Sequence, residues 1–155
     1  MPETTTLPMT PMTPDTAISA FGYLRAVQAG DVEAAREFAG AEPRMAGLLV
    51  DAVERIVVPV TALPGPEAGE PTAEMFALEG LGRVLVTSLR TWAQAGPDAA
   101  EGIAHAVIEF VVQFLTDEHE DIADVLRQLE AVGVGQALAA HPAPAGSRLV
   151  RLSIV

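Results

Sequence analysis

The sequence predicts an all-α protein, an irregular bundle of five or six helices with a flexible N-terminal arm and an extended C-terminal tail. Between residues 14 and 141, apolar residues recur at i, i+3, i+4 and i+7, which is the helical period. Half of the 155 residues are hydrophobic, so the chain can bury one sizeable core. Residues 44–132 lack the alternating pattern of strands. We therefore expect a helical domain over residues 14–141, an arm over 1–13 and a tail over 142–155.

The predicted arm contains two Pro-Met-Thr triplets at residues 8–13, and proline biases such a segment towards polyproline II. It has few groups to bury, so we expect disorder; insertion of Leu7, Met9 and Met12 into a partner is the alternative. The arm has no positive charge and no long apolar run, which excludes a secretory signal of the usual kind. We therefore expect a cytoplasmic protein.

The first two helices are delimited by strong local signals. Thr13 can cap a helix that has Pro14 at its first position, and Gly30 can adopt the left-handed conformation that ends it near Ala29. Asp31 can then cap a second helix. These signals predict a helical hairpin.

The hairpin carries GDVEAA at residues 30–35, with Phe38 and Pro43 downstream. Over Tyr23–Pro43 the chain resembles the turn and second helix of a tetratricopeptide repeat, and it is similar to the opening helices of NTF2-like domains. A repeat array needs further copies at a fixed period, and the chain has none. An NTF2-like domain needs strands after its helices, where this chain keeps the helical period. Neither resemblance therefore implies a site residue.

A third helix is expected from Pro43 to Pro59, because proline favours the first turn of a helix and breaks its interior. Its apolar stripe is one candidate surface for a protein partner. The stripe comprises Met45, Leu48, Leu49, Ala52, Val53, Ile56 and Val57. Three prolines and two glycines then predict an internal linker over residues 64–71, which separates helices of one domain.

A fourth helix follows the linker and is interrupted in the pattern by Gly80 and Gly82. Each glycine costs about 0.5–1 kcal/mol against alanine inside a helix, so we expect close packing or a kink at this point. A glycine-rich phosphate loop would need a preceding strand and a lysine, and the chain has neither here. If the protein binds a small molecule, the apolar cavity predicted for it lies near Gly80, Gly82 and Trp92.

The fifth and sixth helices flank an acidic break. After Gly96-Pro97-Asp98, the fifth helix has an apolar face opposite a polar stripe formed by Glu101, His105, Glu109 and Gln113. Thr116 and Asp117 are expected to cap the sixth helix. The apolar stripe of the sixth helix comprises Ile122, Val125, Leu126, Leu129 and Val132, and Gly133 and Gly135 are expected to end it. The tail beyond ends in the second candidate partner interface, formed by Leu149, Val150, Leu152, Ile154 and Val155.

Composition excludes several classes of function. The formal charge is −12, with nine arginines and no lysine, which argues against nucleic-acid binding and against attraction to anionic membranes. The longest apolar run, Ile103–Leu115, is shorter than the roughly twenty residues that span a bilayer. Without cysteine there is no disulfide, thiolate nucleophile or cysteine-bound metal.

The titratable clusters do not match known catalytic or metal-binding patterns. The acidic run over residues 117–124 has neither the spacing nor the glycine of an EF-hand loop. His105 lies between Glu101 and Glu109 at helical spacing, which suits surface pairing or, alternatively, a proton-transfer or metal cluster. We expect no catalytic residue, cofactor or metal. The expected function is a non-catalytic protein–protein interaction or scaffold protein, binding another protein or itself, and the alternative is a small-molecule-binding regulatory domain.

Overall fold

The chain folds into an all-α bundle, as the sequence predicts. The computed structural model describes residues 12–62, 73–117 and 120–141, and these contain helices and no strand. The elements are α1 (Pro14–Ala29), α2 (Val32–Ala41), α3 (Met45–Ala52), the π-helix η1 (Val53–Val57), α4 (Val58–Ala62), α5 (Ala73–Ala93), the 3₁₀-helix η2 (Pro97–Ala99), α6 (Ala100–Leu115) and α7 (Ile122–Ala140). Because α3, η1 and α4 are continuous, the described residues form six helical rods. The predicted linker and tail lie outside them.

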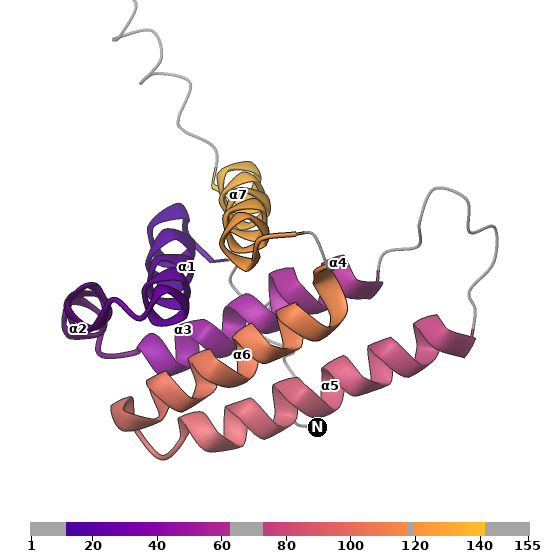
Figure 1. The fold of residues 1–155 in the computed structure, drawn as a ribbon, viewed down its shortest axis with the longest axis horizontal. Coiled ribbons are helices and arrows are strands. Elements are labelled where there is room, and N and C mark those ends of the chain that lie inside the picture. The colour runs from indigo at the N-terminus through magenta and orange to yellow at the C-terminus, as the bar shows by residue number, and fades with distance from the viewer. Residues whose placement is uncertain (1–11, 63–72, 118–119, 142–155) are drawn as a thin grey trace, which may run out of the picture.

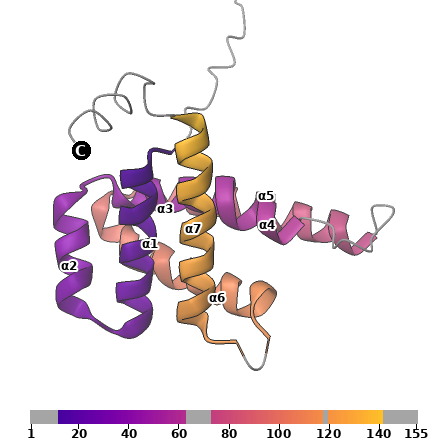
Figure 2. The ribbon, with the colours of Figure 1, turned by 90° about the horizontal axis from the view of Figure 1, so that it is seen from above.

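The rods form two layers that cross each other (Figure 1). One layer contains α1, α2 and α7, which run alongside one another in Figure 2. The other contains the α3–α4 rod, α5 and α6. Within this second layer α5 is outermost, on the side away from α1 and α7 (Figure 1). The core lies between the layers and is apolar, and among the described residues no polar or charged residue is buried.

The α1–α2 hairpin forms through the predicted local signals. The Thr13 hydroxyl accepts a hydrogen bond from the Thr16 backbone N–H at 3.2 Å, and Pro14 is the first residue of α1. Gly30 adopts φ 73°, in the left-handed region where glycine is favoured. The Asp31 carboxylate then accepts from the Ala34 N–H at 3.1 Å. These contacts confirm the predicted start and end of α1 and the predicted start of α2.

The prediction that Pro59 ends the third helix is wrong. Proline lacks an N–H and its ring collides with the carbonyl four residues earlier, so an ordinary α-helix would break there. Here the helix widens into η1 just before Pro59, and the Val58 N–H bonds to the Val53 carbonyl five residues back. A π-turn shifts the hydrogen-bonding partners by one residue, which accommodates a proline that follows it.

The third helix also buries the stripe that was a candidate partner surface. All seven residues of the stripe, from Met45 to Val57, belong to the core of the domain. The stripe is therefore unavailable to a partner in the folded protein, which corrects that prediction. Met12, the first described residue and the only described apolar residue of the predicted arm, is buried in the same core, beside Ile56 and Gly133.

Glycines that were expected to stop or interrupt helices lie inside them. Helix α5 is continuous through Gly80 and Gly82, and α7 continues past Gly133 and Gly135 to Ala140. A Cβ added at Gly133 would lie 2.5 Å from Ile56 Cδ1, so this glycine makes room for a core side chain. Gly133 is buried in α7, whereas Val132, which was predicted to belong to the apolar stripe, is exposed.

The break between α6 and α7 occurs where expected, but its caps differ. Thr116 ends α6, and its hydroxyl donates to the Val112 carbonyl at 2.6 Å. Asp121, rather than Thr116 or Asp117, caps α7, because its carboxylate accepts from the Ala123 N–H at 3.0 Å. Helix α6 therefore ends at Leu115, and α7 begins at Ile122.

Alanine substitutions at the two glycines of α5 should shift stability in opposite directions. A Cβ at Gly82 would lie 2.7 Å from Val58 Cγ1, whereas a Cβ at Gly80 would have no atom within 4 Å. We expect Gly80→Ala to raise the free energy of unfolding by about 0.5–1 kcal/mol and Gly82→Ala to lower it by about 1 kcal/mol. Urea denaturation at low protein concentration measures both. Equal effects of the two substitutions would contradict the packing described here.

Candidate functional site

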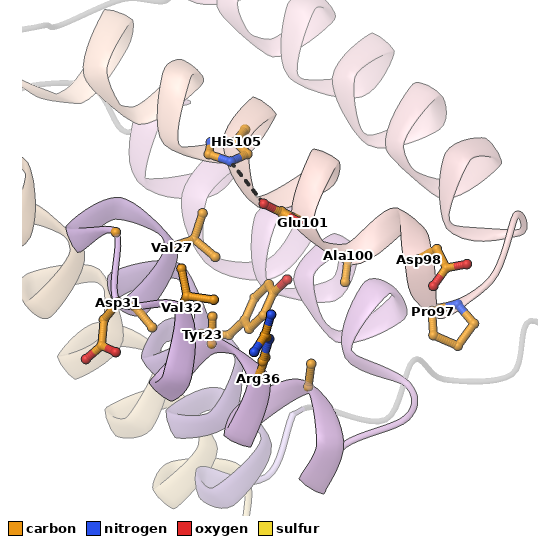
Figure 3. Close-up of a pocket in the computed structure, with 14 residues that line it drawn as sticks. Tyr23, Val27, Asp31, Val32, Arg36, Pro97, Asp98, Ala100, Glu101 and His105 are labelled. Carbon is orange, nitrogen blue, oxygen red and sulfur yellow. Dashed lines mark ion pairs between the residues drawn. The ribbon is translucent and has the colours of Figure 1, made fainter.

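A cleft of about 600 Å³ lies between the α1–α2 hairpin and the start of α6, and it is called here the α1–α2–α6 cleft. Its walls are mostly small apolar side chains, and its rim is charged (Figure 3). The lining residues are Tyr23, Ala26, Val27, Gly30, Asp31, Val32, Ala35, Arg36, Ala39, Pro97, Asp98, Ala100, Glu101 and His105. The turn at Gly30 and η2 bring these segments together.

Tyr23 forms part of the floor of this cleft. Its side chain projects from α1 towards α6 (Figure 3), and the residue is only 4% exposed. The hydroxyl has no hydrogen-bond partner in the described part of the chain. Burial raises the pKa of the Tyr23 hydroxyl, and the negative charge of Glu101 raises it further. The phenol is therefore protonated at neutral pH and keeps both a donor and acceptor lone pairs.

Three carboxylates and one guanidinium line the cleft, on Asp31, Asp98, Glu101 and Arg36. The Glu101 carboxylate lies 3.9 Å from His105 Nε2, and both side chains are well exposed. The structure thus brings Glu101 and His105 together as a surface pair one helical turn apart.

Glu109, the third member of the predicted histidine cluster, lies apart from the cleft. It accepts a hydrogen bond from Gln113 at 3.1 Å and is not among the residues that line the cavity. Among the described residues, no three His, Asp or Glu side chains are placed to share a metal ion.

The second candidate site is an exposed apolar surface on α5, called here the outer face of α5. The inner side of α5 buries only Gly82 and Leu89. Four large apolar side chains of α5 are 43% to 63% exposed, namely Phe76, Leu81, Val84 and Trp92. The exposed residues on the same face are small and uncharged. They include Ala73, Ala77, Gly80, Thr87, Ser88 and Thr91. Isolated exposed apolar residues are common, whereas a continuous uncharged helix face is a candidate for a contact surface.

The charged residues of α5 are confined to its flanks. Arg83 pairs with Glu79 at 2.7 Å, and Arg90 pairs with Glu54 of η1. The pair between Arg90 and Glu54 connects α5 to the α3–α4 rod within the same layer.

Gly80, Gly82 and Trp92, around which a ligand cavity was predicted, do not line any one of the four cavities described for this structure. Gly82 packs against Val58, and it lines a cavity that includes neither of the other two residues. Gly80 faces open space, and Trp92 covers Gly102 of α6, where an added Cβ would lie 2.3 Å from the indole ring.

The predicted partner interface at Leu149, Val150, Leu152, Ile154 and Val155 lies outside the described residues. No described helix is both long and apolar enough to cross a lipid bilayer. Comparison with protein-family models, with curated proteins and with solved structures finds no match to this chain.

Proposed function

We propose that this chain is a non-catalytic protein–protein interaction or scaffold protein whose contact surface is the outer face of α5. The observation that carries the proposal is the exposure of Phe76, Leu81 and Val84 on one helix whose opposite side is already packed. Covering apolar surface contributes roughly 25 cal/mol for each Å² removed from water. A partner that covers this face is therefore favoured.

The partner proposed is a second copy of the chain. The protein carries a formal charge of −12, so two copies repel each other over most of their surface. Helix α5 carries Glu74, Glu79, Arg83 and Arg90, which sum to zero charge. Two copies can thus meet at α5 without bringing an excess of carboxylates together.

The spacing along α5 also suits a helix–helix contact. Exposed small or β-branched residues recur alternately every four and every three positions, at Ala73, Ala77, Gly80, Val84, Thr87 and Thr91. This is the period of a helix seam that faces a partner helix. Small side chains in the seam allow the two helix axes to approach closely.

The expected contact is weak. A helix of this length presents a strip about 30 Å long and about 10 Å wide, which is smaller than the roughly 800 Å² per partner of standard stable complexes. We expect a dimer with a dissociation constant in the micromolar range, about −8 kcal/mol or weaker.

Sedimentation velocity over a range of concentrations tests this proposal. Val84→Glu places a charge in the middle of the seam and should raise the dissociation constant at least about ten-fold. Val132→Glu is the matched control, since Val132 is exposed on α7, away from α5. A protein that stays monomeric at all concentrations, or a dimer that Val132→Glu weakens as much as Val84→Glu, would overturn the proposal.

Small-molecule binding is a second candidate function, supported by the volume of the α1–α2–α6 cleft. About 600 Å³ lies within the range of about 300–1,000 Å³ found for ligand sites. No residue of α5 lines this cleft, so the two candidate functions are structurally separate.

A further inference from the structure

We propose that the α1–α2–α6 cleft binds a small organic cation, a primary ammonium group attached to an apolar body. This inference concerns a different surface from the outer face of α5, and it holds or fails independently of dimerisation. Three features of the cleft carry it: the Tyr23 hydroxyl, the balance of charge, and the apolar walls.

The Tyr23 hydroxyl supplies the most specific indication of a ligand. The Tyr23 oxygen is not among the fully buried unpaired atoms of the described chain, so it is open to the cleft and can pair with a donor that enters there. Tyr23 is almost completely buried, lines the cavity and has no partner in the described part of the chain. A donor that enters the cleft satisfies its oxygen, and an ammonium group brings three N–H donors.

The charges of the cleft select for a cation. Asp31, Asp98 and Glu101 contribute three negative charges, and Arg36 contributes one positive charge. Glu101 lines the cleft from the first turn of α6, beside His105 (Figure 3), and its negative charge helps to raise the pKa of the Tyr23 hydroxyl. One N–H of an ammonium can thus be donated to the Glu101 carboxylate and another to the Tyr23 oxygen.

Arg36 is the feature that favours the opposite class of ligand. It lies beside Tyr23 in Figure 3 and forms no ion pair in the described part of the chain, so it offers a site for a carboxylate. Three carboxylates against one guanidinium still favour the cation, and the experiment below compares the two classes directly.

The apolar walls of the cleft determine the chemistry of the uncharged part of the ligand. Ala26, Val27, Ala35, Ala39 and Pro97 present small side chains that leave room for a hydrocarbon or aromatic group. A ligand with both parts therefore has its charged end at Glu101 and its apolar body against the hairpin.

Titrations of the full-length protein with matched probes, followed by amide chemical shifts in NMR, test the inference. The probes are phenethylammonium and 3-phenylpropionate, which share an apolar body and differ in the sign of the charge. We expect saturable shifts around the cleft with the ammonium, a dissociation constant in the millimolar range or tighter, and at least five-fold weaker binding of the carboxylate. Preferential binding of the carboxylate, or no saturable binding of the ammonium, would overturn the inference.

Three substitutions locate the binding within the cleft. Glu101→Gln should weaken ammonium binding at least five-fold, whereas Glu109→Gln, two turns further along the same exposed stripe and outside the cleft, should leave it unchanged. Tyr23→Phe should weaken it about two- to ten-fold without lowering the melting temperature of the ligand-free protein, since the lost hydroxyl has no partner to leave behind. Equal effects of Glu101→Gln and Glu109→Gln, or a Tyr23→Phe protein that folds and binds normally, would contradict this placement.

Discussion

Replacing Phe21 with alanine is expected to lower the free energy of unfolding by about 3–5 kcal/mol, the range measured for buried aromatic residues. Phe21 has no solvent exposure and lies between the two layers, where its ring approaches the position of Gly133 on α7. Because Gly133 has no side chain to move into the space, the cavity left by the ring cannot collapse easily. Urea denaturation measures the loss.

The control for this substitution is Ile18→Ala on the same helix. Ile18 is exposed, so its truncation should change the free energy of unfolding by less than about 0.5 kcal/mol. If both variants lose similar stability, α1 does not pack with the face described here.

Replacing Glu130 with alanine is expected to cost about 1.5–2 kcal/mol. Arg25 of α1 donates to both carboxylate oxygens of Glu130 on α7, at 3.0 and 3.3 Å, and the Glu130 side chain is only 19% exposed. Hydrogen bonds to charged groups contribute about 1.5–3 kcal/mol, and the 37% exposure of Arg25 favours the lower part of this range. Removal of the carboxylate would leave the guanidinium partly buried and unpaired.

Asp124→Ala provides the comparison within α7. Asp124 pairs with Arg127 at 3.1 Å, and both side chains are 58% exposed, so this pair should contribute at most about 0.5 kcal/mol. Thermal unfolding of both variants would distinguish the pairs. A Glu130→Ala protein no less stable than Asp124→Ala would show that the α1–α7 pair does not stabilise the fold.

Local signals in the sequence were sufficient for the first hairpin and for the fold class. Thr13, Gly30 and Asp31 act on backbone groups within three or four residues, so their roles are legible without knowing the rest of the fold. The fold class follows from helical periodicity, which is equally local.

The incorrect predictions involve contacts between distant segments. Whether Gly133 ends a helix or receives Ile56 depends on a neighbour 77 positions away in the sequence. Pro59 is tolerated because the helix widens into a π-turn before it. The residue pattern of η1 does not predict a π-turn. An apolar stripe likewise does not specify whether the chain itself or a partner covers it.

The candidate sites could be predicted only in part. The pairing of His105 with Glu101 was visible from their spacing, but Tyr23 and Arg36 reach the same cleft through the fold. The outer face of α5 did leave a signal. Phe76 and Leu85 are nine residues apart, which places them on opposite sides of a helix, so the apolar residues of this segment cannot all share one face.

The attachment of α5 by one side only has a consequence for its motion. Only two residues of α5 are buried, and Leu85, Val86 and Ala93 pack against the core only partly buried, so we expect its amide protons to exchange with solvent through local opening, before the remaining helices unfold. Trp92, the only tryptophan in the chain, covers Gly102 at the junction of α5 and α6. Intrinsic fluorescence therefore reports on the detachment of this one helix, separately from the core.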